Sequence, residues 1–104
     1  MDWYMYVAYL FGGAFLVNTI PHFVSGVCGR PFPSPFASPP GKGLSSPMVN
    51  VLWGTLNAVV GYFLVCRVGQ FHLRNLVDMV VLGAGGLVMA LMLARTFGRN
   101  AASY

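Results

Sequence analysis

The chain has 104 residues, of which 57% are hydrophobic and only 8% are charged, and its formal net charge is +4. Soluble domains carry about 25% charged residues, and a domain of this length has too little interior to bury so much apolar surface, so we expect the chain to lie in a lipid bilayer. The many apolar and aromatic residues exclude a disordered chain, and the six Lys and Arg residues are scattered singly, which does not indicate nucleic-acid binding.

The first apolar stretch, from about residue 3 to 28, contains no charged side chain and is long enough to cross a bilayer as a helix. Pro21 lies within it and cannot donate a backbone hydrogen bond to Val17, so we expect a kink in this first helix. One face of the helix is small or polar, with residues that recur every four positions: Ala14, Asn18, His22 and Gly26, with Ser25 beside them.

The next segment, 29–47, contains six of the seven prolines. Proline fixes φ and removes a backbone donor, so we expect neither a helix nor a paired strand here. The sequence instead predicts an extended, polyproline-like loop that caps the helix ends through Phe32 and Phe36. A Pro-x-x-Pro recognition strip is the alternative interpretation. Ser45 or Ser46 can cap the helix that follows, and Pro47 suits its first turn.

Two more apolar stretches follow, at about 48–66 and 76–94, with a loop at 67–75 between them and a C-terminal tail at 95–104. Both are long enough to span a bilayer, and their uninterrupted apolar character favours helices over the alternating strands of a membrane barrel. The sequence therefore predicts a single all-α integral membrane domain, 1–104, with three transmembrane helices.

Helices in lipid pack closely where small residues let their backbones approach. The candidate packing residues are Gly54, Ala58 and Gly61 in the second helix and Gly86, Ala90 and Ala94 in the third. The second helix also carries a polar stripe that contains Asn50 and Asn57.

Counting inward from the end that the first two helices share, at about 1.5 Å per residue, places Asn57 level with Asn18. The same count places Gly54 level with His22, and Asn50 level with Ser25. We therefore expect Asn18 and Asn57 to form a hydrogen bond and His22 to lie beside Gly54. Two interpretations stay open: the polar residues form a packing clamp, or His22 is the proton-handling or ligand-binding group of a pocket facing the cytoplasm.

The remaining polar and aromatic residues have simple structural interpretations. The aromatic residues at one end of the helices are expected to anchor that end at the membrane surface: Trp3, Tyr4, Tyr6, Tyr9 and Tyr62. Asp78 lies in the first turn of the third helix, where it favours the helix dipole and can meet Arg74.

Cys28 and Cys66 fall at opposite ends of the helices, so we expect each to be a small buried residue rather than half of a disulfide. His22 and His72 are likewise separated by the membrane, and zinc-binding spacings are absent from the sequence. We expect no metal, haem or other cofactor.

The positive charges predict an orientation. Four cations fall on the side of the 29–47 segment and the C-terminus, and two on the other side: Arg30, Lys42, Arg95 and Arg99 against Arg67 and Arg74. The positive-inside rule places the side with more cations in the cytoplasm, so we expect the N-terminus outside.

Three helices enclose little space, and no nucleophile–base or carboxylate pair is visible in the sequence. We therefore expect a small integral membrane protein that acts as an oligomerising or accessory subunit of a larger membrane complex, and not an enzyme. Its partners would be the lipid bilayer and other membrane subunits or further copies of the chain. Two alternatives remain: a homo-oligomeric channel or transporter for a small solute, and a membrane enzyme that handles a lipid or quinone.

Overall fold

The computed structural model of the protein describes residues 2–40 and 42–100. Helix α1 (Trp3–Val27) is followed by the short strands β1 (Phe32–Pro33) and β2 (Leu44–Ser45). Helix α2 (Pro47–Phe63) continues into a π-helical turn, η1 (Leu64–Val68), and α3 (Leu76–Asn100) ends the described chain. Three helices are long and apolar enough to cross a membrane, which agrees with the expected number of spans.

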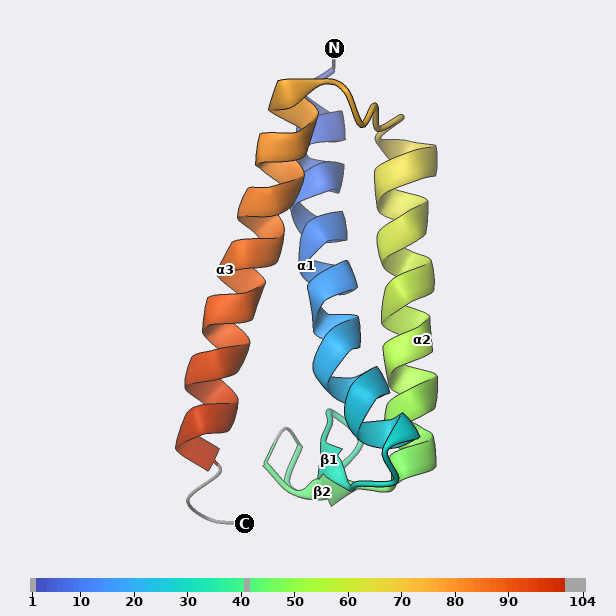
Figure 1. Cartoon of the computed structure of the whole chain (residues 1–104), viewed down its shortest axis with the longest axis vertical. Helices are drawn as coiled ribbons and strands as arrows, with labels where there is room; N and C mark the ends of the chain where they lie inside the picture. The colour runs from blue at the N-terminus through green and yellow to red at the C-terminus, as the bar shows by residue number, and fades with distance from the viewer. Residues whose placement is uncertain (1, 41, 101–104) are drawn as a thin grey trace.

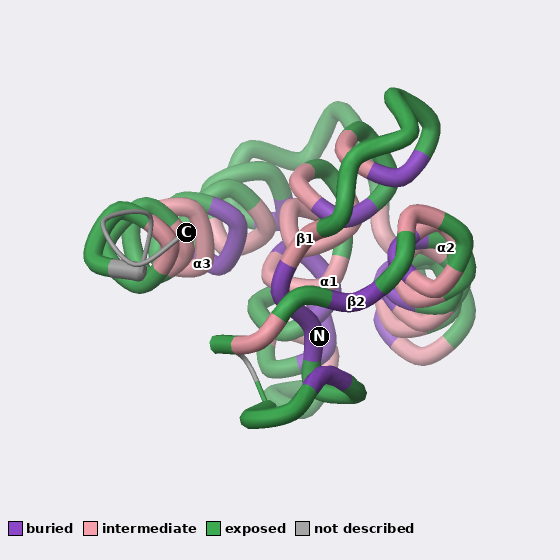
Figure 2. Tube along the Cα trace, turned by 90° about the horizontal axis from the view of Figure 1, so that it is seen from below, coloured by how far each residue is buried: buried purple, intermediate pink, exposed green. Residues whose placement is uncertain are grey.

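Helix α1 lies between the other two helices (Figure 1). Seen along the helices, α3 and α2 flank α1, and the buried residues are concentrated on α1 and on the sides of α2 and α3 that face it (Figure 2). We call the end that carries the N-terminus and the connection from α2 to α3 the N-terminal end, and the opposite end, with β1 and β2, the proline end. Helix α3 approaches α1 closely near the N-terminal end and diverges from it toward the proline end (Figure 1).

Two consecutive glycines explain how α1 can contact both neighbours. A Cβ atom added to Gly12 would meet Val65 and the carbonyl oxygen of Gly61, whereas one added to Gly13 would meet the backbone of Leu82 and Gly86. Because a helix turns about 100° per residue, these two positions face different neighbours. The missing side chains let three backbones come close together.

Side-chain caps set the starts of α2 and α3. The Ser46 hydroxyl accepts a hydrogen bond from the backbone N–H of Val49 at 3.2 Å, and Pro47 occupies the first turn, as expected for α2. The sequence analysis did not anticipate that Asn75 Oδ1 accepts from the N–H groups of Val77 and Asp78, at 3.0 and 3.2 Å. This side chain satisfies two of the donors that the start of α3 leaves unpaired.

The 29–47 segment folds back on itself, so the expectation of a loop without paired strands is wrong. Strands β1 and β2 pair in antiparallel register, Phe32 with Ser45 and Pro33 with Leu44. A ladder of two residues tolerates proline because the proline carbonyl still accepts hydrogen bonds. The hydroxyls of Ser34 and Ser45, 2.6 Å apart, add a second link between the two arms.

Two helices differ in detail from the expected boundaries. Helix α3 continues to Asn100, past the end of the apolar stretch. Helix α1 is continuous from Trp3 to Val27 with Pro21 inside it.

Candidate functional site

The expected hydrogen bond between the first two helices is present. Asn18 Nδ2 donates to Asn57 Oδ1 at 3.0 Å, which links α1 to α2. Asn57 is only 1% exposed, and its own Nδ2 donates to the backbone carbonyl of Trp53 at 2.8 Å. Both the oxygen and the nitrogen of the buried Asn57 amide are therefore hydrogen-bonded.

A second polar contact, between His22 and Asn50, joins three segments. The His22 ring nitrogen Nδ1 lies 2.8 Å from Asn50 Oδ1. The Asn50 amide nitrogen lies within hydrogen-bond distance of three carbonyl oxygens, at 2.9 Å from Phe32, 3.1 Å from Ser46 and 3.3 Å from Ser45. Because this nitrogen faces acceptors, Oδ1 is the atom that faces His22, and Nδ1 must be the donor. The opposite nitrogen, Nε2, then holds a lone pair when the ring is neutral.

The depth matching between α1 and α2 is only partly as expected. A Cβ atom added to Gly54 would lie 2.9 Å from the backbone nitrogen of Phe23, next to His22, so the backbones have about the expected register. Asn50 nevertheless meets His22 rather than Ser25, because the two side chains extend toward each other along the interface and do not stay at the level of their Cα atoms. Ser25 is half-buried.

Aromatic rings enclose His22, which is 3% exposed. Its ring centroid lies 5.5 Å from Phe32, 6.1 Å from Phe97 and 6.3 Å from Trp53, in edge-to-face arrangements. Phe36 packs on Trp53 at 5.2 Å. The 29–47 segment thus caps the helix ends through Phe32 and Phe36, as expected. The contacts of Phe97 and Trp53 with His22 were not predicted from the sequence.

Two adjoining cavities lie beside the polar cluster, by which we mean Asn18, Asn57, His22 and Asn50. The larger one, which we call the apolar groove, has a volume of about 460 Å³ and is bounded by all three helices. Its lining includes Phe11 and Phe15 from α1, Trp53 from α2, and Val88 and Met92 from α3. The smaller one, which we call the polar pocket, has a volume of about 190 Å³ and lies toward the proline end. Its lining includes His22, Ser34 and Thr96.

Trp53 and Asn18 line both cavities, so the apolar groove and the polar pocket meet at these side chains. The indole nitrogen of Trp53 is buried there and has no hydrogen-bond partner among residues 2–40 and 42–100. A buried donor without a partner is destabilising, and few native side chains are left in this state.

The candidate packing residues divide between the two helix interfaces. Gly54 and Gly61 of α2 lie against α1, and Gly86 of α3 lies near Val17 and Gly13. Ala58 and Ala90 are half-buried, whereas Ala94 is exposed and takes no part in packing. The exposure of Ala94 follows from the divergence of α3 toward the proline end (Figure 1).

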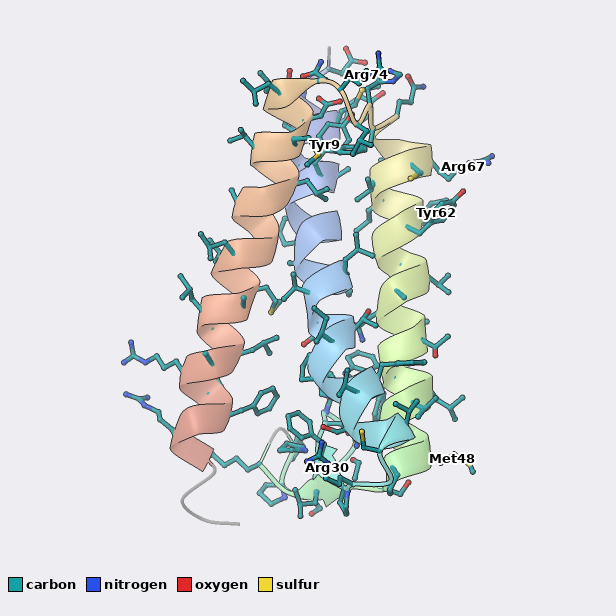
Figure 3. All side chains as sticks on the ribbon, in the orientation of Figure 1. Tyr9, Arg30, Met48, Tyr62, Arg67 and Arg74 are labelled. Atoms are coloured by element: carbon teal, nitrogen blue, oxygen red, sulfur yellow. The ribbon has the colours of Figure 1, made fainter. Side chains whose placement is uncertain are left out.

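A separate buried cluster lies at the N-terminal end. Asp78 is 0% exposed, and its Oδ2 accepts from the backbone N–H of His72 at 3.1 Å rather than meeting Arg74, which is exposed. Its Oδ1 is buried without a partner in the described residues. Tyr9 is also 0% exposed and donates its hydroxyl to the carbonyl of Gly69 (labelled with Arg74 in Figure 3).

Two expectations for single residues are therefore wrong. Tyr9 is a core residue and not an anchor at the membrane surface, because the chain after η1 folds over it. Cys28 and Cys66 are exposed rather than buried. Cys28 is the C-cap residue of α1, and Cys66 lies in the π-helical turn η1.

In comparisons with known proteins, no family model, no curated protein and no solved structure matches this chain. Within the described ranges 2–40 and 42–100, no group of three His, Cys, Asp or Glu side chains is arranged to hold a metal ion. The interpretation of function thus depends on the geometry of the polar cluster, the apolar groove and the outer surface.

Proposed function

We propose that this protein is inserted in a membrane through all three helices and acts as a non-catalytic subunit of a larger membrane assembly, formed with other chains or with further copies. The proposal rests on the hydrogen bonds that the buried polar side chains make within the chain. Asn50 and Asn57 are 0% and 1% exposed and direct their amides to other parts of the same chain. We infer that these hydrogen bonds act as a clamp, which holds α1, α2 and the 29–47 segment together.

The outer surface supports the same proposal. Only 17% of the most apolar stretch of α3 is buried, against 28% for the corresponding stretches of α1 and of α2 with η1. Large apolar side chains such as Leu87 and Leu91 of α3 are more than half exposed. A helix that gives so little of its surface to its own bundle is the natural place for a partner helix to pack.

A channel formed within one chain receives less support, because the helices flank α1 on two sides and the groove between them is lined mostly by apolar side chains. Ion pathways are lined by carbonyl groups or by polar and charged side chains.

We also propose that the proline end faces the cytoplasm. Arg30, Lys42, Arg95 and Arg99 are exposed and belong to the segments at this end, whereas Arg67 and Arg74 lie at the N-terminal end (Figure 3). The larger number of cations favours the cytoplasmic side.

Within the inserted α1, Pro21 leaves the carbonyl of Val17 without its helical donor, so we expect a kink at this turn.

Native mass spectrometry of the full chain, extracted gently from its own membrane, tests the proposed function. We expect a discrete complex of fixed stoichiometry, whereas a monomer that carries only lipid would contradict the proposal. A matched pair of variants locates the contact: Leu87→Trp on α3 and Leu52→Trp on α2, at positions 61% and 65% exposed. We expect the α3 variant to dissociate the complex and the α2 variant to leave it intact.

A further inference from the structure

The apolar groove and the polar pocket together have the form of a site for one small amphipathic molecule. The apolar groove, at about 460 Å³, lies within the range of pockets that take small ligands, roughly 300–1,000 Å³, and the polar pocket adds about 190 Å³ at its end. The groove extends from Leu10 toward Asn18 along α1, and the pocket continues from Asn18 to Ser34 at the proline end. An elongated molecule can therefore lie along α1 with its apolar part in the groove and its head in the pocket.

The lining restricts the charge of the occupant. None of the described residues that line the two cavities is an Asp, Glu, Lys or Arg. A carboxylate or a phosphate placed in such surroundings would lose its hydration without gaining an ionic partner, which is strongly unfavourable. The occupant that fits is uncharged.

The junction of the two cavities restricts the head group. Trp53 contributes its ring to this junction, whereas its indole nitrogen is covered by protein atoms and lies out of reach of an occupant. His22, whose Nδ1 donates to Asn50, offers the lone pair of Nε2. The two rings are 6.3 Å apart and nearly perpendicular, so both border the same small space. A hydroxyl group can donate a hydrogen bond, and it can therefore satisfy the lone pair of His22 Nε2.

We propose that the apolar groove and the polar pocket bind one uncharged lipid with a hydroxyl head, such as a long-chain or isoprenoid alcohol. The hydroxyl donates to His22 Nε2, and the apolar chain fills the groove between α1 and α3. This site is independent of the proposed assembly through the outer face of α3.

The test uses the fluorescence of Trp53. The sequence contains two tryptophans, so the variant Trp3→Phe leaves Trp53 as the single emitter. We place this variant in phosphatidylcholine nanodiscs and add a bromine-labelled long-chain alcohol, its methyl ether, or the carboxylic acid of the same length. The ether cannot donate a hydrogen bond, and the acid is charged. We therefore expect the alcohol to quench saturably at concentrations at least about tenfold lower than the ether or the acid, because loss of one hydrogen bond weakens binding by about this factor.

Equal quenching by all three probes, or by brominated phosphatidylcholine, would mean that ordinary acyl chains fill the groove and would overturn the proposal. So would the absence of saturable quenching. Two α3 variants in the same background provide a matched control: Val88→Phe narrows the groove, and Val80→Phe makes the same change at a position outside its lining. Val88 and Val80 are 56% and 59% exposed, so neither change disturbs a core. We expect only Val88→Phe to abolish saturation, and unchanged binding by Val88→Phe would also overturn the proposal.

Discussion

Asn50 connects more segments than any other side chain in the polar cluster. Its amide group bonds to His22 in α1, to the carbonyl of Phe32 in β1 and to carbonyls at the start of its own helix. Asn18, by contrast, is half-buried and makes one hydrogen bond to Asn57. The two asparagines therefore differ in how many partners lose a hydrogen bond when the amide is removed.

We expect Asn50→Leu to lower the free energy of unfolding by about 1–3 kcal/mol, because it leaves buried groups of His22 and Phe32 unpaired. Asn18→Leu should cost only about 0.6 kcal/mol, the average for one hydrogen bond between membrane helices. Unfolding of both variants in mixed micelles, followed by circular dichroism, measures the difference. Equal losses would contradict a clamp centred on Asn50.

The contacts of single residues were predictable where they depended only on helix period and depth. Asn18 and Asn57 lie on polar stripes of two adjacent antiparallel helices, and counting along these helices was enough to match them. The contact between His22 and Asn50 depends on side-chain reach, which such counting ignores. Tyr9 shares its sequence neighbourhood with exposed Trp3 and Tyr4, and only the fold of residues after η1 buries it.

At the scale of helices and strands, the arrangement depends on close backbone contacts along α1. Gly13 lies against the backbone of α3, where an added Cβ would be 3.0 Å from the nitrogen of Gly86 and closer still to the carbonyl of Leu82. Gly83, also in α3, would meet nothing within 4 Å among the described residues. These two helical glycines provide a matched comparison.

We expect Gly13→Ala to destabilise the fold by roughly 1–3 kcal/mol, because the methyl group meets rigid backbone and must push α3 away. Gly83→Ala should be neutral or stabilising by up to about 1 kcal/mol, since alanine is the better helix former. Thermal unfolding in mild detergent compares the two variants. If Gly83→Ala is the more damaging change, the packing of α3 on α1 described above is wrong.

The long helices could be predicted from apolar length alone, and the start of α2 from Ser46 and Pro47. The pairing of β1 with β2 could not, because two residues carry no periodic pattern and the contact between Ser34 and Ser45 forms only after the segment has folded back. The Asn75 cap was detectable in principle, since asparagine is a favoured N-cap residue.

At the scale of the whole molecule, the position of α1 determines where the cavities form. The sequence predicted three spans but did not say which helix is central. A short connection between α2 and α3 would allow those two to pack together, yet α3 packs along α1 instead (Figure 2). The reason lies in Gly13 and Gly85, at which the backbones of α1 and α3 touch. The divergence of α3 beyond this contact leaves the apolar groove open.

Cysteine labelling in intact cells tests the three-span arrangement and its orientation most directly. Cys28 and Cys66 are exposed, so we expect both to tolerate replacement by serine. Ser38→Cys and Leu73→Cys then each add one thiol at an exposed loop position, on opposite ends of the molecule. We expect a membrane-impermeant maleimide to label Leu73→Cys in intact cells and Ser38→Cys only after permeabilisation. Labelling of both thiols from the same side would contradict a chain in which α2 crosses the bilayer, and the reversed pattern would contradict a cytoplasmic proline end.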